Sequence, residues 1–246
     1  MSVDQRERIG RESYANLALS AMELASLSQA TKTQAAAACV TDSDAILRES
    51  LSLKKGVILV TGHFGNWELL SASLAARGFP VSAVAARMKN RRVDAWLSNL
   101  RERFGTALIP TGRSSGRRAL KALRSGRIVI LLIDQDAKDR GVFVRFLGRM
   151  ASTPAGAATL SQRSGAPIVP CRILRGTALD NTIVFDEALC PPERSEGESA
   201  VHQTMQELTL ILENWIREQP SHWFWPHRRF KTAAPGESSL RAAYDT

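Results

Sequence analysis

The sequence predicts a single α/β domain, residues 1–246, with a largely parallel central sheet flanked by helices. Three observations lead to this prediction. First, 44% of the 246 residues are hydrophobic, which is enough to build one core. Second, short apolar runs of strand length alternate with segments of helical periodicity. Third, these runs are mostly apolar, as expected for parallel strands covered by helices on both faces.

Three regions divide this domain. Residues 1–53 form a helical N-terminal part, 54–236 the α/β core and 237–246 a tail. Asp42 or Ser43 is expected to cap a second helix that ends at Leu53. The apolar residues of the first helix recur every three or four positions, which gives one apolar stripe. These residues are Tyr14, Leu17, Ala21 and Leu24.

The elements of the core follow from periodicity, and a glycine precedes several strands where a helix C-cap is expected. The predicted strands are Val57–Val60, Val81–Ala85, Ala107–Ile109, Ile128–Ile133 and Ile168–Ile173. The predicted helices are Trp67–Ala76, Val93–Phe104, Arg117–Arg124 and, after a polar loop, Val201–Ile216.

The stretch VILVTGHFGNWELL, residues 57–70, places His63 in the turn that leaves the first predicted strand. In open α/β sheets, ligands bind at the carboxyl ends of strands. Asn66 is a suitable N-cap for the following helix, and Glu68 falls in its first turn. The chain can then fold back so that Glu68 holds one imidazole nitrogen and leaves the other as a base. A purely structural histidine–glutamate pair is the alternative interpretation.

A second polar segment, Asp134-Gln135-Asp136, ends the apolar strand Ile128–Ile133. A D-x-D pattern can hold Mg²⁺ or Mn²⁺ in a glycosyltransferase, because hard cations favour carboxylates. Capping of a loop is the structural alternative. The sequence contains no G-x-S-x-G elbow, which disfavours a serine hydrolase.

The net charge is +9, which favours an acidic partner. A nucleic-acid-binding module is one alternative. However, the chain has only two tyrosines and eight phenylalanines and lacks the mixed aromatic and basic pattern of a stacking platform. Basic residues gather in three runs that could border one cleft. These are Arg87, Lys89, Arg91 and Arg92; Arg113, Arg117 and Arg118; and Arg228, Arg229 and Lys231.

Four segments in order resemble the bacterial lipid A late acyltransferases, the lauroyl and myristoyl transferases of the H-x4-D/E acyltransferase superfamily. They are GHFGNWE at 62–68, AARMKNRR at 85–92, DRGVFVRFLGRMASTPAG at 139–156 and WPHRRFKT at 225–232. The resemblance extends from about Arg11 to Gly236 and implies a glycerol-3-phosphate-acyltransferase-like fold. The chain departs from the family at Met88 and Arg91, where prolines are usual, and at Arg145. These departures leave the acyl acceptor open.

The resemblance implies transfer of a fatty acyl group from an acyl carrier protein thioester to a hydroxyl of a lipid A precursor or related anionic glycolipid. It implies that His63 is the general base and Glu68 its orienter. No metal, cofactor or nucleic acid is expected to take part. The implied substrate-binding residues are Asn66, Arg87, Gln135, Asp136, Arg228 and Arg229.

Family members usually begin with a membrane-spanning helix. The longest apolar runs here have six residues, whereas a spanning helix needs roughly 20. We therefore expect a peripheral protein on the cytoplasmic face of the bacterial inner membrane. Its basic residues would contact the membrane surface, and Trp223 and Trp225 are either core residues or interfacial anchors.

Overall fold

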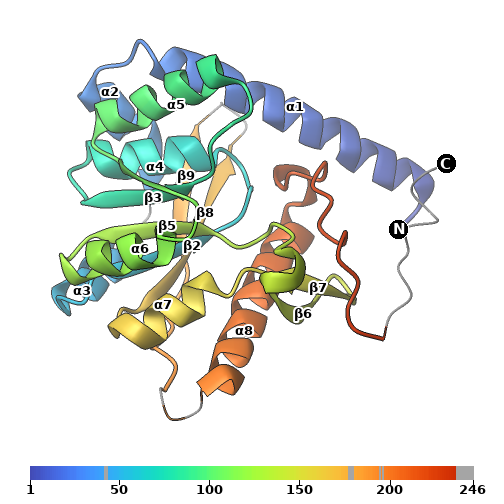
Figure 1. The fold of residues 1–246 in the computed structure, drawn as a ribbon. Coiled ribbons are helices and arrows are strands. Elements are labelled where there is room, and N and C mark those ends of the chain that lie inside the picture. Colours follow the sequence, from blue (N-terminus) through green and yellow to red (C-terminus); the bar gives the residue numbers. More distant parts are fainter. Residues whose placement is uncertain (42–43, 177–179, 194, 196, 237–246) are drawn as a thin grey trace.

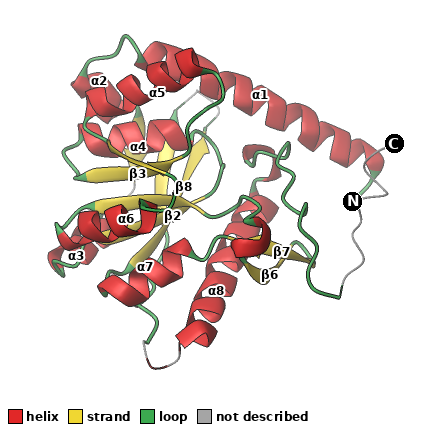
Figure 2. Cartoon of the chain, viewed as in Figure 1, coloured by secondary structure: helices red, strands yellow, loops and turns green. Residues whose placement is uncertain are grey.

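A seven-stranded sheet runs through the molecule and carries helices on both faces (Figure 1, Figure 2). The computed structural model describes residues 1–41, 44–176, 180–193, 195 and 197–236. The strand order is β1-β9-β8-β2-β5-β3-β4. Neighbouring strands are parallel except for β8 and β9, which are antiparallel. The predicted α/β class with a largely parallel sheet is confirmed.

All five predicted strands are present within two residues of their expected ends. They are β2 (Val57–Thr61), β3 (Val81–Ala85), β4 (Ala107–Pro110), β5 (Ile128–Leu132) and β8 (Ile168–Arg175). The edge strands β1 (Cys39–Thr41) and β9 (Asn181–Phe185) were not predicted. Strand β1 lies within the N-terminal part that was expected to be helical, so three residues of that part belong to the sheet.

Eight α-helices are found among the described residues. They are α1 (Val3–Leu27), α2 (Lys32–Ala37), α3 (Ala45–Ser52), α4 (Trp67–Ala76), α5 (Arg91–Phe104), α6 (Ser115–Arg124), α7 (Gly156–Ser164) and α8 (Gly197–Glu218). Two short 3₁₀ helices, η1 (Lys138–Arg140) and η3 (Pro220–His222), complete them. The predicted caps Asp42 and Ser43 and the tail 237–246 lie outside the described residues.

Strand β2 divides the core into two layers because its side chains alternate between the sheet faces. Ile58 and Val60 pack in one buried cluster with side chains of α6, α7 and α8. Val57 and Leu59 pack in a second cluster with side chains of α1 to α5. Burial on both faces explains why β2 is apolar from Val57 to Val60.

A separate hairpin, β6 (Val142–Phe146) and β7 (Arg149–Thr153), lies against α8 (Figure 1). Its two-residue turn places Leu147 and Gly148 at φ angles of 49° and 81°, as a tight hairpin turn requires. Phe146 is fully buried, and its ring lies 5.6 Å from that of Trp223. The hairpin thereby supports the C-terminal segment that reaches the candidate site.

Candidate active site

The candidate site is built where two neighbouring parallel strands end. Thr61 of β2 pairs with Leu132 of β5. The residues two positions further along each strand, His63 and Asp134, therefore emerge side by side at the carboxyl edge of the sheet. This edge is where open α/β sheets bind ligands.

Asp134 holds the His63 imidazole from behind. The distance from His63 Nδ1 to Asp134 Oδ1 is 2.8 Å, and the backbone N–H of His63 donates to Asp134 Oδ2 at 2.7 Å. Trp223 Nε1 donates to the same Oδ2 at 2.9 Å. The Asp134 side chain is fully buried, whereas 14% of the His63 side chain is exposed. The imidazole is thus anchored on one side and open on the other.

The electrostatics keep Asp134 charged. Burial alone would raise the pKa of its carboxyl, but the adjacent His63, through charge and hydrogen bonds, lowers that pKa to about 2. An ionised Asp134 accepts a hydrogen bond from Nδ1–H, which fixes the tautomer in which Nε2 carries a free lone pair. That nitrogen can act as a general base.

Glu68 does not hold the imidazole, contrary to the expectation from its spacing. Its carboxylate accepts from both Nε and Nη2 of Arg101 on α5, with an Nε–Oε2 distance of 2.8 Å. Both side chains are mostly buried, and both line the same cavity as His63. The physical reason is geometric: Glu68 lies on α4 and faces α5, while the imidazole is already held from the sheet side.

His63 opens into a cavity of about 1140 Å³. Much of its wall is apolar and comes from α1, α4, α5 and the ends of β3 and β5. These residues include Leu24, Trp67, Ala83, Val84, Leu97, Ile130 and Leu132. The cavity is large enough for a lipid chain, and the imidazole lies in its wall.

Gln135 and His227 are the other polar neighbours of the imidazole. Gln135 Nε2 lies 3.3 Å from His63 Nε2, and Gln135 lines the cavity. The His227 ring lies 4.3 Å from the His63 ring. Burial, with the nearby His63, lowers the pKa of His227 to about 4. His227 is therefore neutral near neutral pH and does not oppose a positive charge on His63.

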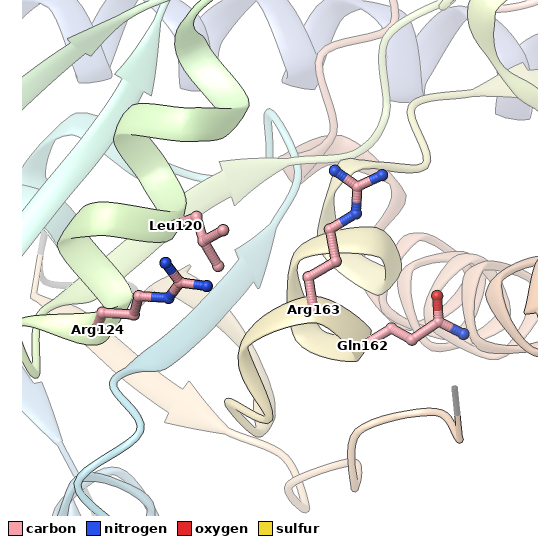
Figure 3. A pocket seen from close by; sticks show the side chains of 4 residues that line it. All are labelled: Leu120, Arg124, Gln162 and Arg163. Carbon is pink, nitrogen blue, oxygen red and sulfur yellow. The ribbon is translucent and has the colours of Figure 1, made fainter. Parts of the chain in front are cut away.

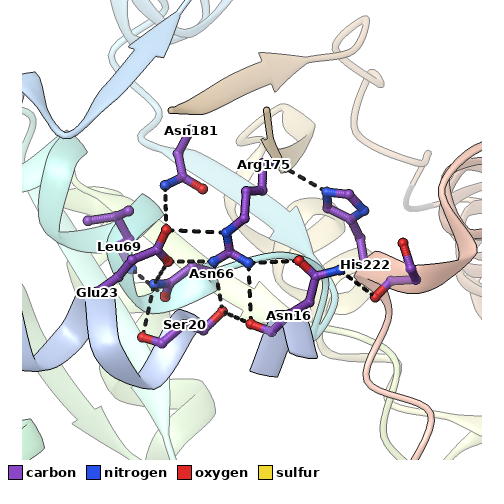
Figure 4. Close-up of polar contacts among 9 residues, drawn as sticks. Asn16, Ser20, Glu23, Asn66, Leu69, Arg175, Asn181 and His222 are labelled. Atoms are coloured by element: carbon purple, nitrogen blue, oxygen red, sulfur yellow. Dashed lines mark hydrogen bonds and ion pairs between the residues drawn. The ribbon is translucent and has the colours of Figure 1, made fainter. Parts of the chain in front are cut away.

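Asn66 is a structural residue at the start of α4. Its side-chain oxygen accepts from Leu69 N–H at 3.1 Å, and its amide donates to Glu23 at 2.8 Å (Figure 4). Glu23 in turn pairs with the buried Arg175, which ties α1 to β8. Both ends of the Asn66 amide are engaged, so the structure gives it a capping role rather than the expected substrate contact.

The other expected substrate-binding residues lie in different places. Asp136 accepts from the backbone and hydroxyl of Thr232, at 3.2 and 2.9 Å. Arg229 is buried, where it donates to Ser152 O at 2.6 Å, and burial lowers its pKa to about 10. Arg228 and Arg87 are exposed, and neither belongs to the cavity wall, although Ala86 and Met88 do.

One group of metal-ligand side chains occurs among the described residues. The ligand atoms of His63, Asp134 and His227 lie within 4.8 Å of one another. Asp134 and Asp136, the two carboxylates of the D-x-D pattern, turn instead to different partners, His63 and Thr232. Absence of a metal requirement stays a prediction.

Asp134, Trp223 and Arg101 are site residues whose roles the sequence reasoning did not assign. Asp134 was noted only as part of D-x-D. Its position after an apolar strand was a usable signal, because neighbouring strand ends gather functional groups. Trp223 is buried, 2% exposed, so it is not a membrane anchor. Nothing local in the sequence marks Arg101 as a partner of Glu68, 33 residues away.

Comparison with known proteins finds a family model and relatives that match most of the chain. The family model described as bacterial lipid A biosynthesis acyltransferase matches residues 1–232. The lipid A biosynthesis palmitoleoyltransferase of Escherichia coli strain K12 is 29% identical over 197 residues, which cover 79% of this chain and 62% of the relative. The lauroyltransferase of the same strain is 30% identical over 203 residues, covering 78% of this chain and 62% of the relative.

A third relative is named for a different acceptor. A phosphatidylinositol mannoside acyltransferase of Mycobacterium tuberculosis strain CDC 1551 / Oshkosh is 30% identical over 129 residues, covering 50% of this chain and 40% of the relative. The chain thus spans 62% of the length of the two Escherichia coli relatives it matches. In the described part of the chain, no helix has the length and apolar character needed to cross a membrane.

Proposed function

The chain belongs to the bacterial lipid A biosynthesis acyltransferase family, and from this premise we propose that it transfers a fatty acyl group from an acyl carrier protein thioester to a glycolipid hydroxyl. The observation that carries this proposal is the His63–Asp134 pair at the wall of a largely apolar cavity. A lipid A precursor is the first acceptor to test, because two relatives are named for lipid A biosynthesis.

The proposed reaction uses His63 as general base. Nε2 takes the proton of the acceptor hydroxyl while its oxygen attacks the thioester carbonyl carbon. The tetrahedral intermediate collapses as the C–S bond breaks, and the imidazolium returns its proton to the departing thiolate. Asp134 is a positioning residue, since it holds Nδ1 and stabilises the positive charge. No covalent enzyme intermediate is needed.

Two side chains of the cavity wall carry N–H groups that are suited to stabilise the negative oxygen of the intermediate. Gln135 presents its side-chain amide beside Nε2, and Arg101 lines the same cavity. One such donor is typically worth about 2.7–4 kcal/mol in the transition state. The Glu68–Arg101 ion pair keeps this guanidinium in place. We assign Gln135 and Arg101 as the candidate oxyanion donors.

The apolar wall of the cavity is suited to the acyl chain. Burial of each CH₂ group contributes about 0.8 kcal/mol, so a long chain gains enough to enter a site lined by Leu24, Leu97 and Leu132. The net charge of +9 favours an acidic carrier protein as the donor and an anionic membrane surface as the place of reaction. The proposed location is the cytoplasmic face of the inner membrane.

The direct test is acyl transfer in a defined mixture. Purified protein, acyl carrier proteins charged with different chains, and vesicles that contain lipid A precursor are incubated, and the lipids are analysed by mass spectrometry. We expect the precursor to gain the mass of one acyl chain. His63→Ala should lower kcat by about 10²–10⁴-fold while the protein stays folded. No mass gain with any chain would contradict the proposal, as would His63→Ala activity above a tenth of wild type.

A further inference from the structure

Besides Arg101, four arginines line the cavity that His63 opens into, and they come from separate segments. Arg113 precedes α6, Arg117 lies in α6, Arg140 ends η1 and Arg163 lies in α7. We propose that this arginine cluster binds a phosphate group of a substrate of the acyl transfer. The proposal rests on the proposed function for its substrate, but phosphate binding itself can be measured without any reaction.

The charges of the cavity wall are unbalanced. Among the described residues of this wall, the one acidic side chain is Glu68, and Arg101 already neutralises it. None of the ion pairs in the described part of the chain includes Arg113, Arg117 or Arg140. Like charges that face one concave site repel each other, so a bound anion would lower the free energy of this arrangement.

Arginines also line a neighbouring cavity of about 430 Å³. Leu120 and Arg124 on α6 and Gln162 and Arg163 on α7 line this second cavity (Figure 3). The two cavities share Leu120 and Arg163. Arg117 and Arg124 are seven residues apart, so they lie on one face of α6. The groove between α6 and α7 therefore carries guanidinium groups along its length.

The ends of two helices add to the attraction for an anion. Ser115 and Gly116 at the N-terminus of α6, and Ala155 and Gly156 at that of α7, also line the large cavity. Neither helix has a side-chain cap, because Ser114 makes no capping bond and Ala155 cannot. The positive ends of both helix dipoles thus point to the same side as the arginines.

Phosphate fits this cluster better than a carboxylate does. Guanidinium groups bind phosphate oxygens in bidentate pairs, and a doubly charged phosphate monoester can engage several of them at once. The resemblance implied Arg87, Arg228 and Arg229 as substrate-binding residues. However, Arg229 is engaged with Ser152 and Thr153, and the other two do not belong to the cavity wall.

Calorimetric titration with inorganic pyrophosphate tests the binding site alone. The double variant Arg117→Gln/Arg163→Gln removes two of the four charges at similar side-chain size. Arg118→Gln is the matched control, since Arg118 lies on the same helix, is exposed and lines neither cavity. We expect the double variant to bind pyrophosphate at least tenfold more weakly and the control to match wild type. Equal affinity in all three proteins, or no binding by wild type, would overturn the proposal.

Kinetics then identify which substrate supplies the phosphate. The double variant should raise KM for a substrate that carries the phosphate and leave KM for the same substrate without it near the wild-type value. One arm compares phosphorylated and dephosphorylated glycolipid acceptors. The other compares acyl-phosphopantetheine and acyl-pantetheine donors. If the variant raises KM only for the phosphorylated substrate of one arm, the site is supported and that substrate is the source of the phosphate. An increase that persists in both arms would overturn it. A lack of any transfer, with pyrophosphate still bound, would instead count against the proposed function.

Discussion

At the scale of single residues, two carboxylates near the cavity have separate roles. Asp134 is fully buried and forms a hydrogen bond with His63, whereas Glu68 lines the cavity and forms an ion pair with Arg101. The spacing of His63 and Glu68 in the sequence suggested a direct pair. In the structure their shared turn brings both residues to the same cavity wall, but each has its own charged partner.

This arrangement makes a specific prediction for Glu68→Gln. The substitution leaves Arg101 partly buried without its full counter-charge, which should lower the unfolding free energy by about 1–3 kcal/mol. It should also lower kcat, because Arg101 loses its fixed position. The pH–rate profile should keep its shape, since His63 and Asp134 are untouched. A profile displaced along the pH axis would show that Glu68 tunes the imidazole after all.

The sequence predicted that His63 follows the end of a strand, as the structure shows, but it did not predict Asp134 as its partner. The position of His63 follows from local features, namely an apolar strand and a glycine-rich turn. Asp134 is 71 residues further along the chain, and its proximity depends on β2 and β5 being neighbours in the sheet. Strand order is set by packing of the whole sheet, which local periodicity does not contain.

At the scale of elements, the turn between β2 and α4 is held in one conformation by Gly65. Its φ angle is +57°, and a Cβ atom there would overlap the backbone oxygen of Ile173 in β8. The backbone N–H of Gly65 also donates to His222 O at 2.9 Å. The turn that presents His63 is thus fixed by backbone contacts with two distant segments.

Gly65→Ala and Gly78→Ala form a matched pair that tests this contact. Gly78 also has a positive φ, +93°, but an added Cβ there has no neighbour within 4 Å. Gly78→Ala should cost only the strain of the left-handed conformation, about 1–2 kcal/mol. Gly65→Ala should cost clearly more, because β8 or the turn must move. Urea unfolding measures both, and equal costs would contradict the proposed tight packing.

Elements with strong periodicity were predictable, and short edge elements were not. Helix α4 was predicted with its observed ends, as was β3. Strand β1 has only three residues, and only some of the side chains of β9 are buried. Neither strand therefore appears in the sequence as a long apolar run. Helix α7 was missed because its small residues, Ala157 and Ala158, give a weak apolar signal although both are buried.

At the scale of the whole molecule, one surface combines exposed apolar and basic side chains. Met88, Val93 and Trp96 are 46%, 38% and 41% exposed, and Met88 also lines the cavity. Four basic residues adjoin them in the sequence, namely Arg87, Lys89, Arg91 and Arg92. We propose that this surface, rather than the buried Trp223, contacts the membrane.

Vesicle flotation tests this surface. Each basic residue near an anionic bilayer contributes about 1 kcal/mol, and salt screens that attraction over about 8 Å at physiological ionic strength. Wild type should float with anionic vesicles at low salt and largely dissociate at high salt. Trp96→Ser should weaken binding to anionic vesicles. Trp225→Ser alters a tryptophan that is distant in the sequence from these residues, so it should weaken binding less. Equal binding by both variants and wild type would rule this surface out.

The most direct test of the proposed base is the kcat of Asp134→Asn. Asparagine keeps the size of the side chain and an oxygen that can accept from Trp223 and the His63 backbone. Its NH₂ group, placed at Nδ1, would donate a hydrogen bond there and move the imidazole proton to Nε2, the nitrogen that must accept the substrate proton. We expect a folded protein, judged by its melting curve, whose kcat is lower by about 10²–10⁴-fold. A folded Asp134→Asn protein with kcat within about tenfold of wild type would contradict the central claim that Asp134 orients His63 as the base.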